Sequence, residues 1–289
     1  MRLAVAVFAL LCAMPLLHVA KAQNRSGSAP SAPVGVDGWG KPATEPTRTG
    51  APAPRRDISG MWQPAKGPSD GIQPLGAKAM PSDGKPEHEP PFTSAGLAAF
   101  NKTKPGVGVR IAPPGEINDP GDYCDPQGMP RADLFEVRTT QILQTPISVI
   151  ILYEFEKRWR VIWTDGRELP KDPEPRWYGY SVGKWVDDNT LFVETIGTDE
   201  RTWIDNAGRP HSSDLHIEER FHRVDHDTLE ISVSLDDPKF YTKPWVALDK
   251  FPMRLDRANF DVREMICSPS EFAEYNKEIG TRATPPASK

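Results

Sequence analysis

Hydrophobic side chains recur at every second position over much of the chain after Phe135, which is the period of a β-strand. Turn sequences such as Asp165-Gly166 and Asp187-Asp188-Asn189 separate these runs. The predicted strands cover residues 147–155, 159–163, 180–186, 191–195, 215–223, 229–235, 245–248, 253–255 and 263–267. Strands at short spacing joined by hairpins predict a mainly β fold, an antiparallel meander that curls into a barrel or a sandwich. We assign this domain to residues 135–289, with a short helix near its end.

Proline separates an irregular N-terminal part from this strand-rich part. Twenty of the 31 prolines lie before Phe135, and the other 11 are spread over the longer second part. Residues 23–56 are mostly Ser, Gly, Pro and Ala, so they cannot bury enough apolar surface to offset their ordering entropy, and we predict a disordered linker. Residues 57–134 are predicted to be a Pro-rich wrap on the second half, with a short helix capped by Thr93 or Ser94.

The N-terminus has the three parts of a secretory signal peptide, which we assign to residues 1–22. Arg2 supplies the positive charge, an apolar run extends from Leu3 to Leu17, and Ala20 and Ala22 are the small residues that a signal peptidase reads. The apolar run is shorter than the roughly 20 residues that span a bilayer. We therefore expect cleavage near Ala22 and a soluble mature protein without a membrane span, in the periplasm or outside the cell.

The charge of the mature chain argues against nucleic acid as a partner. Removal of residues 1–22 lowers the number of basic side chains from 35 to 33 against 40 acidic ones, and the formal charge from −5 to −7. Nucleic acids and anionic membranes bind basic patches, so we expect neither as a partner. The oligomeric state does not follow from the sequence.

The mature chain keeps two cysteines, Cys124 and Cys267. In an oxidising compartment, two cysteines most simply form one disulfide, which here would close a loop of more than 140 residues. The alternative is a reactive or metal-binding thiol pair, but no C-x-x-C spacing supports it.

Histidine and acidic side chains gather in one segment of the second half. This polar group consists of His211, Asp214, His216, Glu218, Glu219, Arg220, His222 and His226. Strand alternation puts Glu219 on the same face as Leu215, Ile217 and Phe221. A carboxylate among apolar neighbours has a raised pKa and can act as a general acid or base. The alternative is a buried ion pair with Arg167 or another arginine, or a contact at the end of the barrel.

His211 follows Gly208 and Pro210 in a predicted turn, where a barrel mouth presents side chains. Paired with Asp205 or Asp214 it would be an oriented general base, and otherwise it is an exposed loop histidine. A metal site needs three or four converging ligands. His211 and His216 with Asp214 or Glu218 could supply them, but the spacing matches no zinc signature, so we predict no metal.

Aromatic side chains are the second candidate set. Trp159 and Trp163 recur at strand period, and we interpret them as core. The residues that we predict to bind a ligand are Trp177, Tyr180, Trp203, His216, Tyr241 and Trp245. Aromatic walls with a few polar groups are typical of a small-molecule pocket. The same residues would also suit a sheet face covered by the N-terminal wrap.

Several sequence phrases resemble a large group of exported bacterial proteins of mostly unassigned function. These phrases are D-I-S-G-M-W at 57–62, W-Y-G-Y-S-V-G-K-W at 177–185, G-R-P-H-S at 208–212, E-E-R-F at 218–221 and Y-T-K-P-W at 241–245. The resemblance covers most of the chain after residue 57 and implies a lipocalin-like barrel. It brings no settled chemistry, and a fold by itself does not supply a function.

Three classes of function remain open. The first is a barrel pocket that binds an apolar or aromatic small molecule. The second is a cofactor-independent hydrolase, lyase or isomerase that uses His211 with Glu219 or Asp165, with Arg167 stabilising anionic charge. The third is an envelope interaction module tethered by its linker. No G-x-G-x-x-G or phosphate-binding loop is present between a strand and a helix, so we expect no nucleotide cofactor. We place binding first.

Overall fold

A computed structural model describes residues 37–41 and 49–278. The predicted signal peptide and most of the predicted linker lie outside these residues. Among the described residues, no helix is long and apolar enough to cross a membrane.

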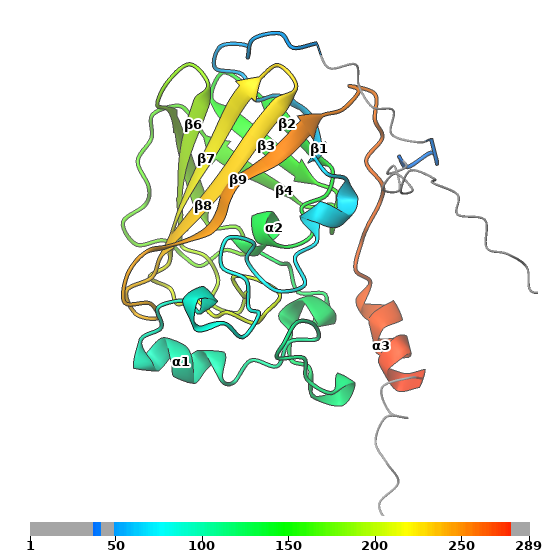
Figure 1. Cartoon of the computed structure of the whole chain (residues 1–289), viewed down its shortest axis with the longest axis vertical. Coiled ribbons are helices and arrows are strands. Elements are labelled where there is room, and N and C mark those ends of the chain that lie inside the picture. The colour runs from blue at the N-terminus through cyan, green and yellow to red at the C-terminus, as the bar shows by residue number, and fades with distance from the viewer. Residues whose placement is uncertain (1–36, 42–48, 279–289) are drawn as a thin grey trace, which may run out of the picture. The chain divides into compact units, whose positions relative to one another are not determined.

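The described residues form a closed barrel of nine strands, in which the order around the barrel follows the order along the chain (Figure 1). The strands are β1 (Gly60–Pro64), β2 (Thr140–Gln144), β3 (Ser148–Tyr153), β4 (Trp159–Trp163), β5 (Tyr180–Trp185), β6 (Thr190–Ile196), β7 (His216–Asp225), β8 (Thr228–Asp236) and β9 (Trp245–Leu255). β1 pairs with both β2 and β9 and so closes the barrel. The mainly β fold predicted from the alternation and the lipocalin-like barrel implied by the resemblance are both confirmed.

One strand pair departs from the antiparallel meander. β4 and β5 are parallel, whereas the other pairs between the described strands are antiparallel. Asp165-Gly166 forms a bend after β4 but not a hairpin, and the chain continues to β5 through residues 164–179. Pro170, Pro173 and Pro175 lie in this connection. Proline cannot donate to a strand ladder, and the connection forms no strand of its own but only a single bridge, from Arg176 to Thr198.

The segment predicted to be a wrap also supplies a wall of the barrel. β1 belongs to it, and Trp62 of β1 is fully buried with its indole N–H donating to the Ile58 carbonyl at 2.9 Å. The barrel therefore begins before residue 135. β1, which carries Trp62, pairs with β2 on one side and β9 on the other and so completes the sheet.

Short helices lie between and after the strands. They are η1 (Pro68–Gly71), η2 (Pro86–His88), α1 (Ser94–Phe100), η3 (Pro114–Glu116), η4 (Pro120–Tyr123), α2 (Arg131–Leu134) and α3 (Pro269–Glu278). The predicted cap of α1 is confirmed, since the Thr93 hydroxyl accepts a hydrogen bond from the Gly96 N–H at 3.0 Å.

The described parts of the predicted linker contact the barrel. Asp37 pairs with Arg257 at 2.6 Å, and Thr49 donates from its backbone N–H to Asp227 at 2.6 Å. Ion pairs and hydrogen bonds thus hold these residues in place of the apolar burial that the segment lacks.

Cys124 and Cys267 form the predicted disulfide, with Cα atoms 5.3 Å apart. The bond joins the residue after η4 to the segment that follows β9. It therefore ties the C-terminal part of the chain to the loops before α2.

The barrel interior is apolar, as the alternation predicts. In β8 every second residue is buried, and Figure 1 shows β8 between β7 and β9. Leu229, Ile231 and Val233 of β8 and Phe221 of β7 belong to one buried cluster. Glu219 lies on this inner face of β7 with no exposed surface, so a charged group stands inside the core.

Candidate functional site

β4 places an arginine inside the barrel and its aromatic residues outside. Arg160 and Ile162 are buried, whereas Trp159 is 64% exposed and Trp163 is partly exposed. The interpretation of these two tryptophans as core is therefore wrong. Their positions on β4 are set by Arg160, which points inward to the carboxylate of Glu219.

The buried pair of Arg160 and Glu219 has two hydrogen bonds, at 2.8 and 2.5 Å. Arg160 also donates to the hydroxyls of Ser181 at 3.1 Å and Thr195 at 2.9 Å. Glu219 thus forms the buried ion pair that was the alternative to a catalytic role. Its partner is Arg160 and not Arg167. A buried charge needs such a partner, because removal from water without one is very costly.

Asp133 of α2 brings a second carboxyl to the same guanidinium. Its Oδ2 lies 3.6 Å from Nη1 of Arg160, and its side chain is 5% exposed. Burial, followed by the charge of Glu219, raises the pKa of Asp133 well above its usual value. Burial also acts to raise the pKa of Glu219, but the charge and hydrogen bonds of Arg160 lower it overall. These opposite shifts favour the proton on Asp133 and the negative charge on Glu219, opposite the cation.

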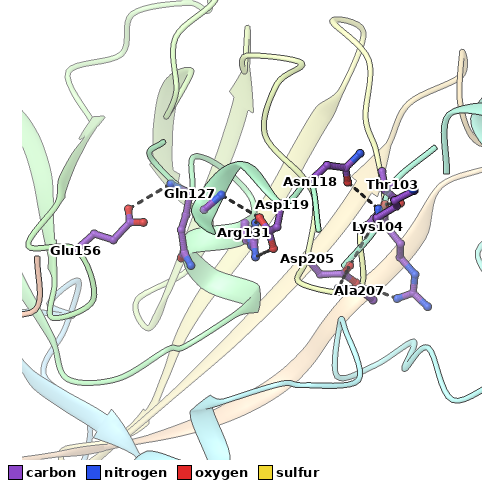
Figure 2. A network of polar contacts seen from close by, with 12 residues as sticks. Thr103, Lys104, Asn118, Asp119, Gln127, Arg131, Glu156, Asp205 and Ala207 are labelled. Carbon is purple, nitrogen blue, oxygen red and sulfur yellow. Dashed lines mark hydrogen bonds and ion pairs between the residues drawn. The ribbon is translucent and has the colours of Figure 1, made fainter. Parts of the chain in front are cut away.

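Asp133 is positioned by the polar contacts of the neighbouring Arg131, which Figure 2 shows among those of nearby loops. Arg131 is 3% exposed and donates two hydrogen bonds to Asp119, at 2.6 and 2.7 Å. Gln127, just before α2, donates its backbone N–H to Glu156 at 3.2 Å. Both contacts fix the start of α2, so we interpret this network as support for the cluster.

A cavity of about 590 Å³ lies on the outer side of β4 and β5, and we call it the β4/β5 cleft. It is lined by Trp159, Arg160, Val161, Trp163, Arg167, Glu168, Pro170, Arg176, Tyr178, Gly179, Tyr180, Ser181 and Val182. The two strands share only the pairs Ile162–Ser181 and Trp163–Val182 in the described ladder. Arg160 and Ser181 belong both to the lining of the cleft and to the buried cluster, so the cleft and the cluster are adjacent at this point of the barrel.

Two guanidinium groups lie over aromatic rings in the cleft. Arg167 is 3.7 Å from the ring centroid of Trp163, and Arg176 is 4.1 Å from that of Tyr180. Asp165 pairs with Arg167 at 2.6 Å, and the hydrogen bond from Arg167 lowers the pKa of Asp165. The predicted pair of Asp165 and Arg167 thus meets at the rim of the cleft, with Asp165 already bound to its neighbour.

His211 is buried, contrary to its expected place at an open mouth. It is 2% exposed, with Nε2 at 2.7 Å from the Thr202 hydroxyl and Nδ1 at 3.1 Å from the Ser212 carbonyl. Burial lowers its pKa, so the neutral ring is favoured. The loops around it exclude water, which the turn sequence alone does not reveal. His211 and Glu219 lie in separate hydrogen-bond networks of the described residues.

His216 lies on the outer face of β7, half-buried, with Nε2 3.4 Å from Glu194. Within residues 37–41 and 49–278, no group of three or more His, Cys, Asp or Glu side chains is placed to hold a metal ion.

The other predicted ligand-binding aromatics lie outside the cleft. Tyr241 and Trp245 are buried, 5.5 Å apart between ring centroids, and Phe92 of the wrap lies 5.2 Å from Tyr241. Trp203 is 6% exposed. These three residues fit the alternative of a face covered by the wrap, and Trp177 carries Arg201 4.3 Å above its ring. Of the six predicted residues, Tyr180 lines the cleft.

The sequence reasoning missed Arg160, Asp133 and Arg176. The signal for Arg160 was a charged residue between Trp159 and Val161 in an otherwise apolar strand. Asp133 and Arg176 carried no local signal, because their roles depend on residues distant in the sequence.

Comparison with protein-family models, with curated proteins and with solved structures gave no match.

Proposed function

We propose that the protein binds a small molecule with a flat apolar body in the β4/β5 cleft. The observation that carries this proposal is the exposed aromatic surface of Trp159, beside the partly exposed Trp163, in a cavity of about 590 Å³. Ligand sites of small molecules have volumes of roughly 300–1,000 Å³ and combine apolar walls with a few polar groups. The site is on the wall of the barrel and not at the mouth that the sequence suggested.

Binding accounts for the cleft better than catalysis by the residues predicted from the sequence. His211 and Glu219 do not line the cleft, and Asp165 is held in an ion pair with Arg167. A general base must come within hydrogen-bond reach of the proton that it takes. The exposed side chain of Trp159, in contrast, needs no rearrangement to contact a ligand.

Export of the protein belongs to the same proposal. The disulfide between Cys124 and Cys267 supports an oxidising compartment, as does the signal sequence over residues 1–22. The ligand would then be a molecule found in the periplasm or outside the cell.

Native mass spectrometry of mature protein from its own host tests the proposal. We expect a retained small molecule on the wild type that is lost from Trp159→Ala, since this tryptophan is 64% exposed and its removal spares the core. Trp39→Ala is the matched control, because Trp39 is 78% exposed and does not line the cleft.

Equal retention by Trp159→Ala and the wild type would place the ligand elsewhere and contradict the proposal. A wild type that retains nothing, and whose melting temperature no planar aromatic compound raises, would also contradict it.

A further inference from the structure

Cations outnumber anions on the surface of the β4/β5 cleft. Arg167 and Arg176 line it with charged groups, against Glu168 as the carboxylate in the same lining, whereas the side chain of Arg160 is 1% exposed and is paired with Glu219 inside the barrel. Asp165, which pairs with Arg167, is not part of the lining. A ligand in the cleft therefore meets guanidinium groups before it meets their counter-ions.

The guanidinium of Arg176 has no ion-pair partner among the described residues. In the part of the chain that the structure describes, no carboxylate lies within salt-bridge distance of its guanidinium, which stacks at 4.1 Å over Tyr180. Stacking over a ring holds the plane of a guanidinium while its N–H edge stays free to donate. Arg167 is held in the same way over Trp163, and its bonds to Asp165 use Nε and Nη2, which leaves Nη1.

These stacked arginines also decide which ligands suit the cleft. One guanidinium group covers a face of Trp163 and another covers a face of Tyr180, so a sugar ring or a cation cannot stack on those covered faces. Arginine binds carboxylates through two parallel N–H bonds, which are stronger than bonds between neutral groups. Trp159, 64% exposed, and Val161 leave apolar surface beside them for the rest of the ligand.

We infer that the ligand of the β4/β5 cleft is a carboxylate on a flat apolar body, held through Arg176 with Arg167. This inference rests on the proposed function and adds the charge of the ligand to it. Glu168 is exposed at the cleft, where solvent screens its charge, so it weakens the binding of the carboxylate without preventing it.

Calorimetric titration with three probes of the same shape tests the inference. The probes are 2-naphthoate, the neutral 2-naphthamide and the cationic 2-naphthylmethylammonium. We expect 2-naphthoate to bind about tenfold more tightly than the amide, the effect of one charged hydrogen-bond pair. Added salt should weaken the naphthoate and leave the amide unchanged.

Arg176→Gln should remove the preference for 2-naphthoate while the affinity for 2-naphthamide stays, which shows that the cleft is intact. Arg201→Gln is the matched control, because Arg201 stacks at 4.3 Å over Trp177 but does not line the cleft, and it should keep the preference. Glu168→Gln should strengthen binding of the naphthoate.

Equal affinities for naphthoate and naphthamide would overturn the inference and leave the proposed function standing. Tightest binding of the cationic probe, or an unchanged preference in Arg176→Gln, would also overturn it. If none of the three probes binds, the inference fails together with the proposed site.

Discussion

The buried cluster predicts an unequal response to the loss of its two carboxyl groups. The raised pKa of Asp133 favours its neutral form, so Asp133→Asn should keep the charge of the cluster. Glu219→Gln removes the charge that directly faces Arg160 at 2.5 Å. Asp133, at 3.6 Å from Arg160, can then lose its proton and replace part of the missing charge.

The magnitudes follow from the cost of an uncompensated buried charge, about 3–5 kcal/mol when one partner of a buried pair is removed. For Glu219→Gln we expect a loss of about 2–3 kcal/mol in the free energy of unfolding, because Asp133 compensates in part. For Asp133→Asn we expect a change within about 1 kcal/mol. The double variant leaves Arg160 without a carboxylate and should lose about 3–5 kcal/mol.

Urea denaturation of the four proteins at neutral pH, with the disulfide intact, measures this double-mutant cycle. At the centres of these ranges, the loss in the double variant exceeds the sum of the single losses by about 1.5 kcal/mol. Additive losses, or an Asp133→Asn variant as unstable as Glu219→Gln, would refute the assignment of the proton to Asp133.

Three further outcomes follow from the same structure. The raised pKa of Asp133 means that the folded protein keeps a proton that the unfolded chain releases above about pH 4, so this group lowers the stability of the wild type as the pH rises. In urea denaturation, the free energy of unfolding of Asp133→Asn should therefore increase relative to that of the wild type between about pH 5 and pH 8, and a constant difference would speak against this. His211→Ala should destabilise the fold by about 1–3 kcal/mol in the same assay, since it leaves buried partners unpaired, and a neutral effect would mean that His211 is exposed in solution. Reduction of the disulfide, whose cysteines are 143 residues apart, should remove roughly 4–5 kcal/mol and lower the melting temperature, and an unchanged melt would contradict a stabilising bond.

The sequence predicted much of the barrel because strand alternation is a local property. The face shared by Ile217, Glu219 and Phe221 is buried as expected, and the cap at Thr93 is in place. These features depend on residues within one strand or one turn, where period and capping rules apply directly.

The candidate site could not be predicted from the sequence, because alternation shows which residues share a face of a strand but not which face points into the barrel. In β4, hydrophobicity predicted that Trp159 and Trp163 point into the core. In the structure Arg160 points inward and pairs with Glu219, so the two tryptophans lie on the outer face of the strand. The burial of His211 likewise depends on loops from distant segments. Such contacts between remote residues leave no periodic signal.

A crystallographic screen of small planar aromatic compounds tests the central claim that the β4/β5 cleft is a binding site. We predict that compounds soaked into crystals of the mature protein lie against Trp159 on the outer side of the barrel. Repeated binding at another surface, with an empty cleft that is open to solvent in the same crystals, would contradict the claim.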